Sequence, residues 1–311
     1  MKMENKVPSY FDITKLKKAY ADGENITELL RTQRNVDTNT SEIIEIAYDI
    51  QAGTYIEYTK RNPEQLTLYA NEIAQILNKY TKRDHKLLDV GCGELTTLSF
   101  LISALTNKPN EIYAFDISWS RIYKGRKFAE SKIGNESKRI KSFVGDISEI
   151  PLLDKSIAIT TSSHALEPNG GKLKILLAEL FRVTVDKLIL FEPCYEINSH
   201  EGRERMDRLG YIKDIEGVAA ELGGKLIDKI IIDNITNPLN PTACFIIAPP
   251  VTTTQTTQNK RAIFSVPGTN IPLTKKGHFY HSSETGLCYP ILKNIPILTS
   301  NCSILATSFS D

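Results

Sequence analysis

The sequence of 311 residues lacks the features that mark membrane, secreted and zinc-ribbon proteins. It has no apolar run of about 18 residues, the length needed for a transmembrane helix, and its first residues lack the apolar segment of a signal peptide. Its five cysteines, at positions 92, 194, 244, 288 and 302, form no C-x-x-C pair. This spacing argues against a disulfide framework and against a four-thiolate zinc site. We therefore expect a cytoplasmic protein without a membrane partner.

An excess of charge of one sign is also lacking. The chain has 38 Lys and Arg residues against 37 Asp and Glu residues, a formal net charge of +1. No block of like charge is long enough to follow a phosphate backbone. The composition therefore does not suggest nucleic acid as a partner, although it leaves room for a local basic patch. It leaves the oligomeric state open.

The chain exceeds the usual length of a single domain and divides into four segments by pattern. Residues 1–80 carry mostly helical patterns and predict an N-terminal helical cap. Residues 81–248 alternate short apolar runs with helical patterns. Residues 249–262, PPVTTTQTTQNKRA, have the composition of a linker, and residues 263–311 predict a small β-rich module.

The alternation in residues 81–248 predicts the fold class. Strands that alternate with helices form a mainly parallel sheet with crossover helices on both faces. We therefore expect an α/β protein with a Rossmann-like, doubly wound, seven-stranded sheet. The expected strands are KLLDV, EIYAFDIS, SFVGDIS, IAITTSS, KLILFEP, KLIDKIIID and ACFIIA.

The segment KLLDVGCGELTTL, residues 86–98, predicts a strand, a tight glycine turn and the start of a helix. In dinucleotide-binding proteins the turn reads G-x-G-x-x-G/A, but here the last small residue is replaced by the β-branched Thr96. Asp89, just before the first glycine, would repel a pyrophosphate but would help to orient a cationic ligand. The turn therefore favours a cationic nucleoside over a dinucleotide.

Acidic residues also follow the next two strands. AFDIS places Asp116 at the end of the second strand, with Ile117 beside it, and VGDIS places Asp146 and Ile147 at the end of the third. Asp116 is spaced to bind ribose hydroxyls, and Asp146 can accept a hydrogen bond from an adenine amino group. Three acidic strand ends at one edge of the sheet suit a neutral or positive nucleoside at the topological switch point.

Together, DVGCGELTTL, AFDIS and VGDISEIPL resemble the class I S-adenosylmethionine-dependent methyltransferases, of the methyltransferase type 11-like kind, over residues 86–192. The resemblance implies that Gly91 and Gly93 let the backbone approach the methionine part of S-adenosylmethionine and that Cys92 contributes only its backbone. It implies that Asp116 binds the ribose and that Asp146, with the amide of Ile147, recognises adenine. Ser163, at the end of the fourth strand, is a further candidate contact to the cofactor.

The segment YDIQAGTYIEY resembles the helix that many such methyltransferases fold over the cofactor. Tyr48, Tyr55 and Tyr58 are its candidate contacts, and ordinary packing of a helix face is the alternative.

The acceptor is expected beside TTSSHALEPNGG, which follows the fourth strand. Methyl transfer requires alignment of the acceptor and, for a hydroxyl, removal of its proton. His164, with Glu167 nearby, is the candidate general base, and a capping or wall role is the alternative. Further polar residues that suit a polyhydroxylated acceptor are Glu192, Tyr195, Asn237 and Asn240.

The D-P-P-Y or N-P-P-Y signature of nucleic-acid amino methylation is absent from this position. We therefore expect methyl transfer to a small-molecule or carbohydrate-like acceptor, at oxygen. An RNA or protein methyltransferase and a non-catalytic cofactor-binding module stay open as alternatives.

The tail resembles the small zinc-ribbon-like module that is fused to, or partnered with, some methyltransferases, through GLCYPILKNIPIL. In that module two C-x-x-C pairs bind zinc, whereas none of the corresponding residues here supplies a thiolate. We therefore expect no metal and a module held on the main domain by apolar contacts. The corresponding residues are Val266, Thr269, Ser282 and Thr285, and the expected contacts are Tyr289, Ile291, Ile295 and Ile297.

Overall fold

The computed structural model describes residues 12–251 and 263–308. The expected linker therefore lies largely outside the described residues. None of the helices in these two ranges is both long enough and apolar enough to cross a membrane.

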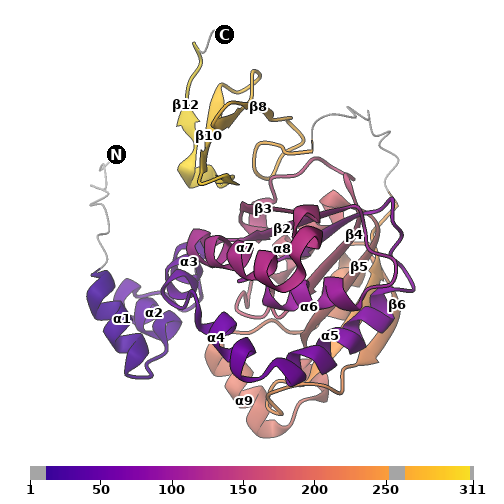
Figure 1. The fold of residues 1–311 in the computed structure, drawn as a ribbon. Helices are drawn as coiled ribbons and strands as arrows, with labels where there is room; N and C mark the ends of the chain where they lie inside the picture. The colour runs from indigo at the N-terminus through magenta and orange to yellow at the C-terminus, as the bar shows by residue number, and fades with distance from the viewer. Residues whose placement is uncertain (1–11, 252–262, 309–311) are drawn as a thin grey trace.

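The main sheet has seven strands in the order β3-β2-β1-β4-β5-β7-β6 (Figure 1). The first five strands along the chain pair in parallel, and β7 runs antiparallel to both of its neighbours. The order reverses between β1 and β4, which makes this boundary the topological switch point. The predicted α/β, Rossmann-like class is confirmed. The strands are β1 (Lys86–Val90), β2 (Glu111–Asp116), β3 (Ile140–Val144), β4 (Ile157–Ser163), β5 (Thr184–Pro193), β6 (Lys225–Ile231) and β7 (Thr242–Ala248).

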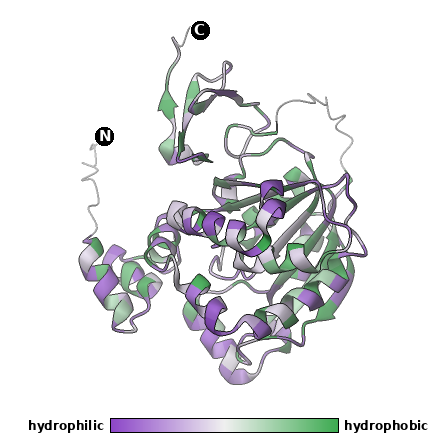
Figure 2. Ribbon diagram, in the orientation of Figure 1, coloured by the Kyte–Doolittle hydropathy of each residue, from purple (hydrophilic) through white to green (hydrophobic). Residues whose placement is uncertain are grey.

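Helices cover both faces of this sheet because successive strand residues point to opposite sides. Leu88 and Val90 pack with α8 and α10, whereas Leu87 packs with α5 and α6 on the other face. Figure 2 shows largely hydrophobic strands between helices that carry both hydrophilic and hydrophobic residues. The elements are α5 (Pro63–Leu77), α6 (Thr96–Ala104), α7 (Trp119–Ile133), η1 (Gly134–Arg139), η2 (Ile147–Glu149), α8 (Leu173–Val183), η3 (Tyr195–Ile197), α9 (His200–Leu209) and α10 (Ile215–Glu221).

The N-terminal helices precede the sheet, as the helical periodicity predicts. Helices α1 (Ile13–Ala21), α2 (Ile26–Arg34) and α3 (Ser41–Ile50) share a small apolar core of their own. Helix α4 (Thr54–Arg61) connects them to α5, which packs on α6 and belongs to the helical layer of the main sheet. The expected cap therefore contains a separate bundle and one helix of the main domain.

The C-terminal module is a five-stranded antiparallel sheet that lies beside the β3 edge of the main sheet (Figure 1). Ile297 forms a parallel bridge to Val144, and the amide of Leu298 donates to the Val144 carbonyl at 2.9 Å. The module thereby pairs with the end of the edge strand β3. Its elements are β8 (Thr274–Lys276), β9 (Phe279–His281), β10 (Leu287–Leu292), β11 (Ile295–Pro296), η4 (Ser300–Cys302) and β12 (Ile304–Leu305).

Apolar side chains join the module to the main domain. The ring of Phe264 packs against those of Tyr113 and Phe143 from the main sheet, with centroid separations of 6.2 and 5.1 Å. Of the four contacts expected from the sequence, Tyr289 enters the main core, and Ile295 and Ile297 pack near Ile122 and Val144. The fourth, Ile291, pairs with Pro296 inside the module.

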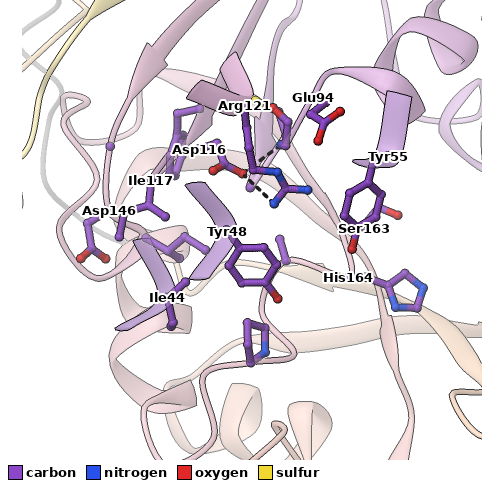
Figure 3. A pocket seen from close by; sticks show the side chains of 18 of the residues that line it. Ile44, Tyr48, Tyr55, Glu94, Asp116, Ile117, Arg121, Asp146, Ser163 and His164 are labelled. Atoms are coloured by element: carbon purple, nitrogen blue, oxygen red, sulfur yellow. Dashed lines mark hydrogen bonds and ion pairs between the residues drawn. The ribbon is translucent and has the colours of Figure 1, made fainter. Parts of the chain in front are cut away.

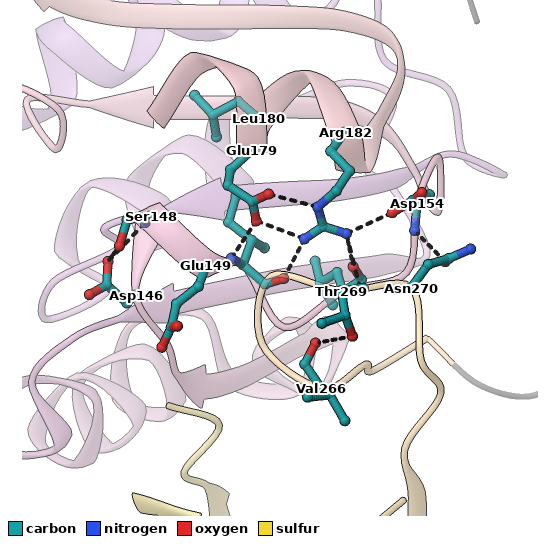
Figure 4. Close-up of polar contacts among 12 residues, drawn as sticks. Asp146, Ser148, Glu149, Asp154, Glu179, Leu180, Arg182, Val266, Thr269 and Asn270 are labelled. Carbon is teal, nitrogen blue, oxygen red and sulfur yellow. Dashed lines mark hydrogen bonds and ion pairs between the residues drawn. The ribbon is translucent and has the colours of Figure 1, made fainter. Parts of the chain in front are cut away.

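A partly buried arginine reinforces this junction (Figure 4). Arg182, in the last turn of α8, donates to the carbonyls of Ile150 and Leu152, to Asp154 and Glu179, and to the carbonyl of Thr269 in the C-terminal segment at 3.3 Å. One side chain thus connects α8, the segment after β3 and the module.

Around the four residues that the sequence analysis matched to zinc-binding cysteines, side-chain hydroxyls stabilise the turns. Thr269 Oγ1 donates to the Val266 carbonyl at 2.8 Å, and Ser282 Oγ accepts from the Thr285 amide at 3.2 Å. In the part of the chain that the structure describes, no group of three or more His, Cys, Asp or Glu side chains could hold a metal ion.

Candidate functional site

The glycine turn lies between β1 and α6, at the switch point of the sheet. Gly91 and Gly93 have φ values of +62° and +53°, in the left-handed region that favours glycine. A Cβ on Gly91 would lie 2.4 Å from the Cβ of Ala165, so the close approach of the two segments also requires glycine. The amide of Cys92 donates to the carbonyl of Phe115 at 2.8 Å and fixes the turn on β2.

A pocket opens above this turn (Figure 3), and most of the predicted site residues line it. Figure 3 shows Asp146 and Ile117 on one side of the pocket and His164 on the other. Asp89 and Glu167 are not among the described residues that line the pocket. Asp89 is buried in β1, and Glu167 contacts the lining residue His164. The predicted residues that do line it are Gly91, Cys92, Gly93, Asp116, Ile117, Asp146, Ile147, Ser163 and His164.

Asp116 stabilises the turn from the end of β2. Its carboxylate accepts hydrogen bonds from the amides of Gly93 at 3.0 Å and Ser118 at 2.9 Å. Two oxygens provide about four acceptor positions, so the carboxylate can still bind ligand hydroxyls. Burial, together with the charge of Asp116, raises the pKa of Asp89 to about 7.

Burial raises the pKa of the Cys92 thiol well above its ordinary value. A neutral thiol is a poor nucleophile, consistent with a role for the Cys92 backbone alone.

Asp146 is oriented by the short helix η2 that follows it. Its Oδ1 accepts from both the amide and the hydroxyl of Ser148, each at 2.8 Å. These bonds fix the Asp146 carboxylate and the adjacent backbone of Ile147 at the end of the pocket nearest β3.

Arg121, which the sequence analysis did not identify, projects into the pocket from the first turn of α7. It is the one lysine or arginine among the described residues that line the pocket, and it is only 8% exposed. Its guanidinium carbon lies 5.0 Å from the ring centroid of Tyr48 and 4.8 Å from that of Tyr55, so both rings make cation–π contacts. Its Nη1 lies 3.8 Å from Asp116 Oδ2, and its Nε has no hydrogen-bond partner among the described residues.

Helices α3 and α4 form a lid over this pocket, as the resemblance implied for this segment. Tyr48 and Tyr55 line the pocket, whereas Tyr58 is 48% exposed and lies outside the lining. The lid is attached to α7 by Asp49, whose carboxylate accepts from the Ser118 hydroxyl at 2.6 Å and from the amide and hydroxyl of Ser120 at 3.1 and 2.9 Å. A carboxylate at a helix N-terminus is stabilised by the helix dipole.

A second carboxylate, that of Glu94, attaches the lid to the glycine turn. Helix α4 begins after Gly53, which has no side chain to cap it. Glu94, in the glycine turn, is 1% exposed and accepts from the amides of Gly53 at 2.8 Å and Ile56 at 2.9 Å. The turn and the lid therefore form one connected structure.

His164 and Glu167 lie together at the opposite side of the pocket from Asp146. His164 Nδ1 is 3.0 Å from Glu167 Oε2, and its Nε2 is 3.0 Å from Thr242 Oγ1. Asn240 donates to the same Glu167 oxygen at 3.1 Å. Burial opposes protonation of His164, but the hydrogen bond and charge of Glu167, with the charge of Glu192, outweigh it and raise the pKa of the imidazole.

Glu192 organises the segment that carries His164. Its Oε1 accepts from the Ser162 hydroxyl at 2.7 Å and from the amides of Ala165 and Leu166 at 3.1 and 3.2 Å. Burial raises the pKa of Glu192 to about 7. Its contacts are therefore those of a buried support for the loop after β4.

The other predicted acceptor residues divide between the pocket and more distant turns. Ser163 lines the pocket and its hydroxyl lies 2.7 Å from that of Tyr69 on α5. Tyr195 donates to Asp207, and Asn237 accepts from the amide of Leu239. Asn240 is the member of the asparagine pair that reaches the His164 cluster.

Comparison with known families agrees with this geometry. Residues 88–188 match the family described as a methyltransferase domain. No curated protein matches the chain. The sheet order, the glycine turn and this match define a class I S-adenosylmethionine-dependent methyltransferase domain. The protein is accordingly a methyltransferase with S-adenosylmethionine as its methyl donor.

The chain is also similar to parts of solved structures. A chain in a complex between the Trm112 methyltransferase activator and a methyltransferase of Haloferax volcanii is 13% identical, with a TM-score of 0.51, and the match covers 65% of this chain and 98% of that one. An S-adenosylmethionine-dependent methyltransferase of Aquifex aeolicus is 16% identical, with a TM-score of 0.45 and coverages of 60% and 94%. Geranyl diphosphate C-methyltransferase of Streptomyces coelicolor, solved with S-adenosyl-L-homocysteine, is 13% identical, with a TM-score of 0.44 and coverages of 58% and 80%.

Proposed function

We propose that this methyltransferase acts on a hydroxyl oxygen of a small-molecule or carbohydrate-like acceptor that binds beside His164. The observation that carries the proposal is His164, which lines the same pocket as the strand-end carboxylates and has Glu167 3.0 Å from its Nδ1. A hydroxyl must lose its proton when it is methylated, and a histidine oriented by a carboxylate is suited to accept that proton. The lid over the pocket favours an acceptor small enough to enter it.

We assign the two ends of the cofactor as follows. S-adenosylmethionine supplies an activated methyl group on a sulfonium. Asp116 would accept from the ribose hydroxyls, and Asp146 with the amide of Ile147 would bind the adenine. Arg121 is a buried cation next to the glycine turn, because a Cβ on Gly93 would lie only 2.9 Å from Arg121 Nη2. This cation would bind the carboxylate of the methionine part.

The hydrogen bonds of His164 support this role as a proton acceptor. We assign the proton to Nδ1, which donates to the Glu167 carboxylate, so that the lone pair lies on Nε2 and accepts from the Thr242 hydroxyl. An acceptor hydroxyl that replaces Thr242 at Nε2 would pass its proton to His164. Glu167 would then stabilise the imidazolium, and Asn240 would hold Glu167 in place.

The proposal is tested by the chemistry of the product. The enzyme is incubated with methyl-labelled S-adenosylmethionine and with matched pairs of sugars and cyclitols that carry a hydroxyl or an amine at the same position. We expect methyl ethers from the hydroxyl member of a pair. Transfer only to nitrogen or carbon across the panel would contradict the proposal, and the cofactor assignment would stand.

A further inference from the structure

Positive charge gathers on one segment of this nearly neutral chain. Residues 118–142, which cover α7, η1 and the start of β3, contain eight lysines and arginines and two glutamates, which gives a formal charge of +6 (8 − 2). The whole chain has a net charge of +1. The remaining residues therefore have a net negative charge, and the overall composition does not show that this segment is basic.

Part of this charge surrounds a groove with a volume of about 480 Å³, on the side of α7 that faces β3 and the module. Tyr123, Arg126, Lys127 and Glu130 form one wall, because residues at i, i+3, i+4 and i+7 share a helix face. Opposite this wall are Ser137, Lys138, Ser142 and Lys293. The four cationic side chains are exposed, and Glu130 is the one acidic residue in the described lining.

The wall from the module is fixed in place. Lys293 and Asn294 form the two-residue turn between β10 and β11, and both have left-handed φ values, +52° and +61°. Arg126 Nη1 donates to the carbonyls of Lys293 at 3.3 Å and Asn294 at 3.0 Å. Next to this turn, the side chain of Ile295 is buried against Ile122 and Val144. Docking of the module therefore places Lys293 at the groove.

An aromatic surface accompanies the cations. Tyr123 lines the groove and stacks on Trp119, with ring centroids 4.8 Å apart and an interplanar angle of 11°. Lys127 Nζ lies 4.6 Å from the centroid of the Tyr123 ring. A basic groove with an aromatic ring in its wall is the arrangement by which proteins bind single-stranded nucleic acid, through phosphates and base stacking.

We propose that this groove binds single-stranded nucleic acid and that the C-terminal module completes the binding surface. Arg126, Lys127, Lys138 and Lys293 contact phosphates. When Lys127 turns from the Tyr123 ring to a phosphate, a base stacks on the ring in its place, on the face opposite Trp119. An acidic polypeptide would use the cations but would have no base to place on Tyr123, so the ring favours nucleic acid.

The groove and the cofactor pocket share α7. Arg121 faces the pocket and Arg126 faces the groove, five residues further on, a rise of about 7.5 Å along the helix axis. A ribose hydroxyl of the bound strand is a carbohydrate-like acceptor, so the inference is compatible with the proposed function. Binding in the groove does not rest on that function.

The test uses the full chain and fluorescein-labelled, unstructured 20-nucleotide RNA and DNA, with anisotropy measured over a range of salt concentrations. A triple variant, K127Q/K138Q/K293Q, removes three cations of the groove. We expect at least tenfold weaker binding and a log–log salt slope that is smaller by about 2, because each phosphate contact contributes about 0.7. A Tyr123→Leu variant should weaken binding and leave the salt slope unchanged.

The matched control is K17Q/K79Q/K225Q, which loses the same charge from exposed lysines outside the groove. Both triple variants should melt like the wild type and bind S-adenosylhomocysteine equally. The RNA and DNA arms show which strand is preferred. Equal losses in the two triple variants, no binding of either strand, or equally tight binding of poly-glutamate would overturn the inference. Retained cofactor binding with methylation of small hydroxyl acceptors would leave the proposed function intact.

Discussion

Replacing Arg121 by methionine tests how the pocket holds the methionine end of the cofactor. The guanidinium is already buried and is held between Tyr48 and Tyr55, so it needs little further desolvation to bind a carboxylate. A hydrogen bond to a charged group contributes about 1.5–3 kcal/mol. At about 1.4 kcal/mol per factor of ten, Arg121→Met should weaken binding of S-adenosylhomocysteine about 10- to 150-fold.

The assay is calorimetric titration with two ligands, S-adenosylhomocysteine and its decarboxylated analogue. The wild type should prefer the carboxylated ligand, and Arg121→Met should bind both with nearly equal affinity, because only one ligand has the group that Arg121 contacts. Thermal melting checks that the variant is folded after the loss of the cation–π contacts. Tighter binding of both ligands to the variant would show that Arg121 obstructs the pocket, and equal losses for both would show that it only supports the pocket wall.

The remaining predictions concern the base, the lid and the module. His164→Ala should slow methyl transfer by about 10²–10⁴, the range for general base catalysis, with cofactor affinity nearly unchanged; a variant that loses the cofactor instead would make His164 a wall residue. Glu167 raises the pKa of His164, and the base must be neutral, so the wild-type rate should increase as pH rises through that pKa, and Glu167→Gln should move this limb to lower pH; an unmoved limb in the rate profile would exclude the pair. Glu94→Gln should increase hydrogen exchange in residues 41–61, since one oxygen can no longer accept from the lid amides; unchanged exchange would refute the attachment. Elemental analysis should find no stoichiometric zinc, and removal of residues 263–311 should lower solubility while sparing cofactor binding; one equivalent of bound zinc would contradict the description of the module.

The sheet and the strand-end carboxylates could be predicted from the sequence because both depend on local patterns. Alternating apolar runs define the strands, and an acidic residue directly after a parallel strand must lie at the carboxyl edge. Asp116 and Asp146 lie at this edge and line one pocket. Asp89 belongs to the same pattern but is buried in β1, because it precedes the turn and its side chain does not reach the lining.

Arg121, Asp49 and Glu94 could not be assigned from the sequence because their contacts join segments that are far apart in the chain. Glu94 contacts amides about 40 residues earlier, and Asp49 contacts serines about 70 residues later. A glycine at the start of α4 and a serine before α7 hint at helix starts but do not identify what binds them. The basic groove could not be predicted from the net charge either, because the net charge is a sum over the whole chain and does not show where the charges lie.

The central claim is that the pocket at the switch point is built for an S-adenosyl ligand and not for a dinucleotide. It is tested most directly by titrating the wild-type protein with S-adenosylhomocysteine and, separately, with NAD under the same conditions. We predict micromolar binding of S-adenosylhomocysteine and no binding of NAD, because Thr96 replaces the small residue that a dinucleotide turn requires and the acidic edge repels a pyrophosphate. Binding of NAD without binding of S-adenosylhomocysteine would contradict the account.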